Sequence, residues 1–147
     1  MTPCIVALGS NLGDREANLE VAVAKLGSVF DVIARSRWMD TTPMYLVDQP
    51  RFLNGVVKIH SAFGPLATLN ELQLIETEMG RERLIENGPR TMDLDLITYG
   101  ILQYRFNLPQ GHIVIPHERA FERDFVLGPW SQIDKESLDF FEKILTK

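Results

Sequence analysis

The stretch Met92-Asp93-Leu94-Asp95-Leu96-Ile97-Thr98-Tyr99 completes the pattern of elements that decides the fold of this chain. The run is short, rich in leucine, isoleucine and tyrosine, and ends at Gly100, which is typical of a β-strand. Alternate side chains of a strand share a face. We therefore expect Asp93 and Asp95 on one side of the strand, with the methionine and the leucines on the other.

Three strands and two helices are expected before this stretch. Leucine and valine recur at helical spacing after Asp14, a residue type that caps helices, and apolar residues do so again after Pro65. In chain order we expect a strand over 4–8, a helix over 14–27, strands over 30–38 and 52–60, and a helix over 65–80. The resulting order β-α-β-β-α-β is the ferredoxin-like arrangement. The predicted fold class is α+β, with helices covering a mainly antiparallel sheet.

The remaining segments are read as connections and C-terminal additions. Residues 40–50 have the turn chemistry of a long loop, because two prolines punctuate them. Beyond residue 100 we expect a hairpin through 107–111, a helical turn over 118–123 and a terminal helix over 137–146. No linker, internal repeat or low-complexity segment divides the chain, so we expect a single domain over residues 1–147.

Composition narrows the class of protein. The 147 residues include 15 Lys and Arg against 20 Asp and Glu, a formal net charge of −5, which argues against a nucleic-acid partner. Cys4 is the only cysteine, which excludes a disulfide scaffold and favours a cytoplasmic location. No apolar run reaches about 18 residues, so we expect no membrane span. The first residues lack a basic segment, so we expect no signal peptide.

Asp93 and Asp95 are the sharpest chemical feature. Their backbone positions in a strand lie roughly 6.7 Å apart, twice the rise per residue. Two such carboxylates repel each other unless a cation lies near them, and hard oxygen ligands without His or Cys suit Mg²⁺, with a phosphate substrate supplying further oxygens. The alternative is a solvated edge strand whose acids pair with Arg90 or Arg123.

Arginine dominates the positive charge around this strand. Six arginines and no lysine lie between Arg81 and Arg123, and the planar arginine fork suits phosphate. Arg90 follows the stiff Gly88-Pro89 entry to the strand and lies beside the two aspartates in sequence. Neither common glycine-rich phosphate loop is present, so side chains and metal would have to bind any nucleotide. A salt-bridged surface is the alternative reading of the same arginines.

Four blocks of sequence resemble one known family. They are Ala7-Leu8-Gly9-Ser10-Asn11-Leu12-Gly13-Asp14, Asp48-Gln49-Pro50-Arg51-Phe52-Leu53-Asn54, Gly88-Pro89-Arg90-Thr91-Met92-Asp93-Leu94-Asp95-Leu96-Ile97, and Ile115-Pro116-His117-Glu118-Arg119 with Arg123-Asp124-Phe125-Val126-Leu127. In this order they resemble the 6-hydroxymethyl-7,8-dihydropterin pyrophosphokinase family of folate biosynthesis. The resemblance runs nearly end to end.

The resemblance implies a fold and a reaction. The family has the βαββαβ fold and transfers the terminal diphosphate of ATP to the hydroxymethyl group of a reduced pterin, releasing AMP. By resemblance, Asp93 and Asp95 would hold two Mg²⁺ ions against the ATP phosphates. Arg83 and Arg90 would stabilise charge in the transition state. Asp95, or a metal-bound water, would accept the proton of the hydroxyl group.

The resemblance also implies binding residues for both substrates. The expected ATP-binding residues are Gln73, Glu76, Arg81, Arg83, Arg90, His117 and Arg123. The expected pterin-binding residues are Thr42, Pro43, Phe52, Asn54 and Phe125, with the two phenylalanines enclosing the ring and Asn54 reading its polar edge. We expect ATP and 6-hydroxymethyl-7,8-dihydropterin as the partners, no nucleic acid or membrane, and a monomer.

The chain departs from the family in one loop. Asn87 stands where family members commonly carry a tryptophan, the loop over 84–87 is about one residue shorter, and His112 stands where an arginine is expected. The alternative function is therefore a catalytically weak or silent relative that binds pterin or nucleotide. A second alternative is an RNA-binding domain on the same fold, which would need a basic face and exposed strand aromatics.

Overall fold

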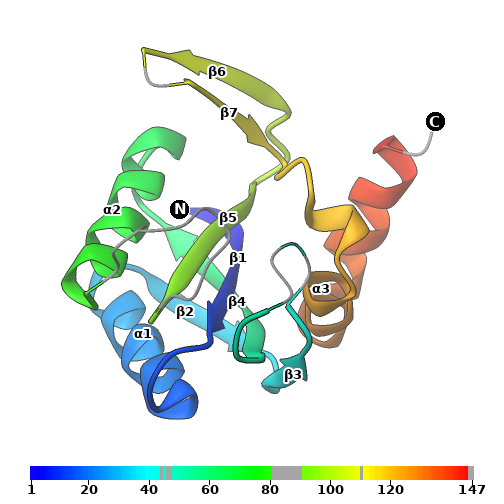
Figure 1. Cartoon of the computed structure of the whole chain (residues 1–147). Helices are drawn as coiled ribbons and strands as arrows, with labels where there is room; N and C mark the ends of the chain where they lie inside the picture. The colour runs from blue at the N-terminus through cyan, green and yellow to red at the C-terminus, as the bar shows by residue number, and fades with distance from the viewer. Residues whose placement is uncertain (44, 46–47, 81–90, 110, 146–147) are drawn as a thin grey trace.

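An antiparallel sheet forms the centre of the computed structural model, which describes residues 1–43, 45, 48–80, 91–109 and 111–145 (Figure 1). Four strands pair in the order β2-β4-β1-β5, and the short β3 pairs with β4. Their bounds are β1 Thr2–Ser10, β2 Asp31–Arg35, β3 Met39–Thr41, β4 Phe52–Ser61 and β5 Asp93–Tyr99. Every pairing in this sheet is antiparallel. The expected ferredoxin-like topology is confirmed.

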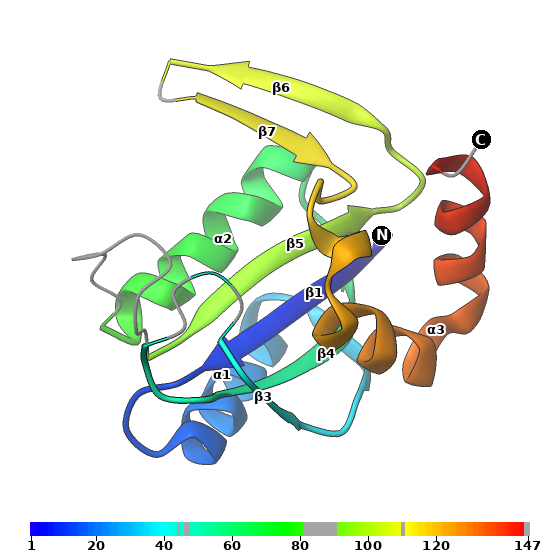
Figure 2. The ribbon, with the colours of Figure 1, turned by 45° about the vertical axis from the view of Figure 1, so that its right-hand side comes forward.

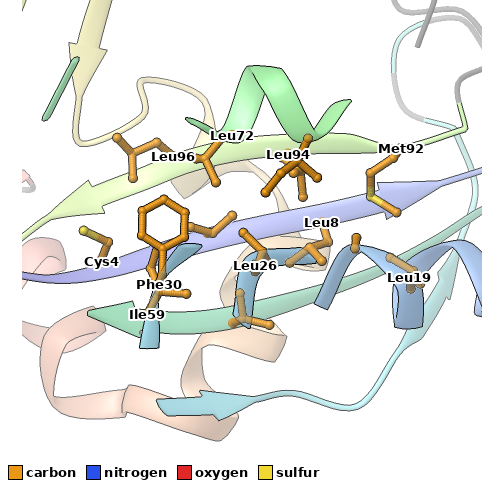
Figure 3. Close-up of a cluster of buried hydrophobic side chains, with 14 of the residues drawn as sticks. Cys4, Leu8, Leu19, Leu26, Phe30, Ile59, Leu72, Met92, Leu94 and Leu96 are labelled. Carbon is orange, nitrogen blue, oxygen red and sulfur yellow. The ribbon is translucent and has the colours of Figure 1, made fainter. Parts of the chain in front are cut away.

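Helices α1 (Arg15–Val29) and α2 (Pro65–Glu78) cover one face of the sheet. The Asp14 side chain accepts a hydrogen bond from the Ala17 N–H at 3.1 Å and begins α1, as its residue type predicts. Side chains of both helices meet β1 and β5 in a core in which Leu72 of α2 and Leu94 of β5 are buried (Figure 3). Helix α2 therefore packs against the apolar face of β5, and α1 packs against β1 and β2.

The opposite face is covered by η1 (Ala120–Glu122) and by α3 (Asp124–Leu145) (Figure 2). Trp130 of α3 is fully buried there with Phe141, and its indole N–H donates to Ser137 Oγ at 2.9 Å. Strand β1 is thus buried on both sides, which explains its uninterrupted apolar run in the sequence.

A two-stranded hairpin extends beyond the sheet, as Figure 2 shows. It consists of β6 (Tyr104–Leu108) and β7 (Gly111–Ile115) and confirms the expected hairpin through 107–111. The turn between 118 and 123 is the expected helical turn, η1. Of the helices in the described ranges, none has both the length and the apolar character needed to cross a membrane.

The strand predicted over 30–38 is wrong at its end. Strand β2 stops at Arg35, and a separate strand, β3, overlaps the first residues of the loop expected over 40–50. The physical reason lies at Gly55 of β4, because a Cβ there would come within 2.3 Å of the Trp38 ring. The indole of Trp38 lies over this glycine, and pairing with β4 resumes only after it.

The terminal helix predicted over 137–146 is only the second half of α3. The helix begins at Asp124 and changes direction at Asp134, whose backbone is non-helical. The Asp134 side chain accepts a hydrogen bond from the Ser137 N–H at 3.1 Å, so it caps the half that the spacing of apolar residues had predicted. Pro129 lies inside the first half. Because proline usually breaks a helix, the sequence does not predict a helix there.

Candidate active site

A pocket of about 320 Å³ opens on the α3 face of the sheet. Its walls come from β1, β3, β4 and β5, from the chain on either side of η1, from the start of α3, and from the segment between β3 and β4. These elements are far apart in the sequence and meet only because the strand order brings β4, β1 and β5 side by side.

Asn54, Gly9 and Asp93 form a row across the floor of this pocket. Gly9 of β1 is paired with Asn54 on one side and with Asp93 on the other. A Cβ at Gly9 would lie 2.7 Å from Asn54 Oδ1 and 3.6 Å from the Phe52 ring. Because Gly9 has no side chain, the Asn54 amide has room to lie beside it. Asn54 is buried, and its Nδ2 donates to Thr41 Oγ1.

Asp93 and Asp95 lie on the same face of β5 and both line the pocket. Leu94, between them, is buried in the core on the opposite face. The alternation expected from the sequence is present. The backbone N–H of Leu94 donates to Glu76 Oε2 at 2.7 Å, so a buried carboxylate on α2 fixes this part of β5.

Positive charge faces the two aspartates across the pocket. Arg123 Nη1 lies 3.8 Å from Asp95 Oδ2, and the Arg123 side chain is 13% exposed. Arg119 lines the same wall. A pairing of Asp95 with Arg123 on a solvated strand was the alternative to metal binding. The structure shows this pair inside a pocket instead.

His117 is half-buried between these groups. Its backbone N–H donates to the Ile97 carbonyl at 2.8 Å, and its Nδ1 accepts from the Arg119 N–H at 3.2 Å. Burial lowers the pKa of His117 below its ordinary value, and the charge of Arg123 acts in the same direction against Asp93 and Glu118. The neutral ring therefore carries its proton on Nε2, because Nδ1 is the acceptor.

The donor set suits Mg²⁺ better than a metal held by protein alone. Within the described ranges, no three His, Cys, Asp or Glu side chains are grouped closely enough to hold a metal ion. Mg²⁺ is usually bound through one or two carboxylates together with water and substrate phosphates. Asp93 and Asp95 meet that requirement.

Residues 5–135 match the profile of the 7,8-dihydro-6-hydroxymethylpterin-pyrophosphokinase (HPPK) family. The chain belongs to this family. A 2-amino-4-hydroxy-6-hydroxymethyldihydropteridine pyrophosphokinase of Bacillus subtilis is 41% identical over 130 residues, which cover 87% of this chain and 75% of the relative.

Some relatives of this chain are much longer than it is. A folic acid synthesis protein of Pneumocystis carinii is 38% identical across 95% of this chain but only 20% of its own length. A mitochondrial folate synthesis bifunctional protein of Pisum sativum is 38% identical across 92% of this chain and 26% of its own length. The chain thus spans about a quarter or less of these two relatives.

A solved HPPK-DHPS, crystallised in complex with substrates, has the same fold. It superimposes with a TM-score of 0.73 at 12% sequence identity, over 89% of this chain and 40% of that chain. At this identity the likeness shows the fold alone, and it agrees with the ferredoxin-like topology.

The structure gathers most of the described residues that the HPPK resemblance had predicted. Those that line the pocket are Thr42, Phe52, Asn54, Asp93, Asp95, His117, Arg123 and Phe125. Pro43 is buried and does not line it, Gln73 is exposed on α2, and Glu76 is engaged with Leu94 as described above. Arg81, Arg83 and Arg90, with the departing loop over 84–87, lie outside the described residues.

The residues of the pocket wall that were not predicted include Tyr45, Gln49, Glu118 and Arg119. Gln49, Glu118 and Arg119 belong to blocks that carry the family resemblance, so their position in those blocks was an available signal. Tyr45 lies in an irregular segment with no periodicity, and no local pattern indicates it.

Proposed function

We propose that this chain transfers the terminal diphosphate of ATP to the hydroxymethyl group of 6-hydroxymethyl-7,8-dihydropterin and releases AMP. One observation carries the proposal. A single pocket combines the buried Asn54 amide and the aromatic rings of Phe52 and Phe125 with a pair of carboxylates and two arginines. The first group suits a planar heterocycle, and the second suits a metal-bound polyphosphate.

The pterin side of the pocket is formed by Asn54, Phe52, Phe125 and Thr42. A pterin has a flat ring and an edge that carries both donors and acceptors of hydrogen bonds. An amide can match such an edge with one donor and one acceptor group, and aromatic side chains offer the ring faces on which to stack. Asn54 is only 6% exposed, and its Nδ2 already donates to Thr41 Oγ1. Leaving the rest of its hydrogen-bonding capacity unused would be costly, which favours a polar ligand at this point.

The nucleotide side is formed by Asp93, Asp95, His117 and Arg123. Two bound Mg²⁺ ions would neutralise the phosphate charge and align the attacking and leaving oxygens. His117 Nε2–H and the Arg123 guanidinium are donors suited to the phosphate oxygens. We infer that Arg83 and Arg90 add transition-state charge stabilisation, and that Gln73, Glu76 and Arg81 contribute to nucleotide binding.

Asp95 is proposed as the acceptor of the substrate proton. The hydroxymethyl oxygen forms a bond to the β-phosphorus of ATP as the bond from that phosphorus to the oxygen of AMP breaks. The hydroxyl proton must leave at this step, and the carboxylate of Asp95 is a base within the pocket.

Location and assembly remain predictions. We propose a cytoplasmic location, which the single cysteine favours, and a monomer. Some relatives are named as mitochondrial or bifunctional proteins. We propose ATP and the pterin as the two small-molecule partners.

The proposal is tested by measuring AMP formed from ATP and 6-hydroxymethyl-7,8-dihydropterin, with and without Mg²⁺. We expect AMP only when the pterin, ATP and Mg²⁺ are all present. Binding of pterin or nucleotide without AMP formation would support the alternative, a silent relative. Failure to bind either ligand would overturn both readings.

A further inference from the structure

Tyr45 lies against two arginines of the candidate active site. The Cζ atom of Arg119 is 4.9 Å from the centre of the Tyr45 ring, and that of Arg123 is 5.2 Å from it. The ring is 41% exposed and lines the pocket, in the segment that joins β3 to β4. One aromatic ring thus contacts two arginines that lie more than 70 positions later in the sequence.

The hydroxyl group of Tyr45 extends this contact. It accepts a hydrogen bond from Arg123 Nε at 3.1 Å and donates to Glu122 Oε1 at 3.2 Å. Arg123 is therefore held at two nitrogens, because its Nη1 faces Asp95 at 3.8 Å. A guanidinium is planar, so contacts at two of its nitrogens restrict both its position and the orientation of its plane.

The arrangement also offsets an electrostatic cost. Arg119 and Arg123 carry like charges on one wall of the pocket, and they repel each other in the absence of an anion. The negative face of an aromatic ring attracts both cations, and the carboxylate of Glu122 balances charge through the hydroxyl group. The two arginines can therefore be held in place before a polyphosphate arrives, which reduces the ordering cost of binding it.

We propose that Tyr45 is a positioning residue for the polyphosphate, acting through Arg123 and Arg119. This inference rests on the proposed function. The phenol proton is already engaged by Glu122, so Tyr45 supports the arginines rather than donating to phosphate itself.

The first test compares Tyr45→Phe with Tyr45→Leu. Removing the hydroxyl alone should lower kcat/KM for ATP about fivefold, and removing the ring as well should lower it about thirtyfold. The KM for the pterin and the melting temperature should stay close to those of the wild type. Calorimetry with a non-hydrolysable ATP analogue and Mg²⁺ should show the same order of affinities.

Tyr99→Phe is the matched control. The Tyr99 hydroxyl donates to the Phe63 carbonyl at 2.7 Å, and Tyr99 does not line the pocket. This variant also loses one phenol hydrogen bond, and it should leave kcat/KM for ATP unchanged.

A double-mutant cycle decides whether Tyr45 acts through Arg123. In an Arg123→Lys background the Nε–H donor is gone, so adding Tyr45→Phe should have no further effect. An equal loss in both backgrounds would overturn the inference, as would an effect confined to the pterin KM, which would make Tyr45 a pterin contact. If the wild type forms AMP and Tyr45→Phe equals it, only this inference fails. If the wild type forms no AMP, the proposed function fails first and this inference with it.

Discussion

Gly9 of β1 is paired with Asn54 of β4, and the Asn54 amide lies where a side chain at Gly9 would collide with it. This relationship puts a buried hydrogen-bonding group at the floor of the pocket, next to the carboxylate of Asp93. It also makes Gly9 sensitive to the smallest substitution.

Gly9→Ala should weaken pterin binding. The added Cβ would come within 2.7 Å of Asn54 Oδ1 and would push the amide out of place. We expect roughly tenfold weaker affinity, measured by calorimetry with the pterin. Gly27→Ala is the control, because a Cβ there meets only a methyl group at 4.0 Å. Equal affinities for Gly9→Ala and the wild type would show that Asn54 does not read the pterin.

Asp95→Asn should lower turnover far more than it lowers the affinity for the pterin. The amide cannot accept the substrate proton and is a poorer ligand for Mg²⁺, so we expect AMP formation to fall roughly a thousandfold. Pterin affinity, measured separately, should change little. Asp31→Asn removes an exposed aspartate at the start of β2, outside the pocket, and should have no effect. Turnover retained in Asp95→Asn would exclude Asp95 as the proton acceptor.

Gly55→Ala should destabilise the fold, although neither Gly55 nor Trp38 lines the pocket. A Cβ at Gly55 would come within 2.3 Å of the Trp38 ring and 3.1 Å of Ser36 Oγ. Trp38 would have to move from its place over β4, at a cost of about 1–3 kcal/mol in the free energy of unfolding. Urea denaturation measures this cost, and Gly27→Ala again serves as the control. A Gly55→Ala protein as stable as the wild type would show that the indole moves freely.

Asp134→Asn should lower stability in a pH-dependent way. Lys58 Nζ lies 2.9 Å from Asp134 Oδ2. Burial alone would raise the pKa of this carboxyl, but hydrogen bonds from Lys58 and Ser137 outweigh burial and lower the pKa below its ordinary value. At pH 7 the variant should be less stable by about 1 kcal/mol, because the charged pair is lost while a capping oxygen remains.

The sign of the pH effect follows from linkage. A lowered pKa in the folded state means that the unfolded chain takes up the proton first, so this stability is present above about pH 4 and is lost as the pH falls through the folded pKa. Wild type and Asp134→Asn should therefore converge in urea denaturation once the pH is below the pKa of Asp134 in the folded protein. Asp139→Asn, which breaks an exposed pair with Lys135, should show a much smaller difference at pH 7. A difference for Asp134→Asn that persists at low pH would exclude the charge as its cause.

Local patterns predicted much of the fold. The alternation of Asp93, Leu94 and Asp95 predicted which side chains share a face, because the period of a strand is two residues. Asp14 and Pro65 marked helix starts, because capping depends on residues a few positions apart. Where a distant residue intervenes, prediction failed. The end of β2 depends on Trp38 lying over Gly55, and the first half of α3 is hidden by Pro129.

The sequence by itself determined the order of the elements, the shared face of the two aspartates and the family resemblance, because these depend on neighbours along the chain. Only the tertiary structure decided that Asn54, Gly9 and Asp93 form one row, because strand register is a property of paired segments. Likewise, Tyr45 meets Arg123 across 78 positions of sequence, and no local pattern encodes that contact. The packing of the sheet against α3 brings the two together.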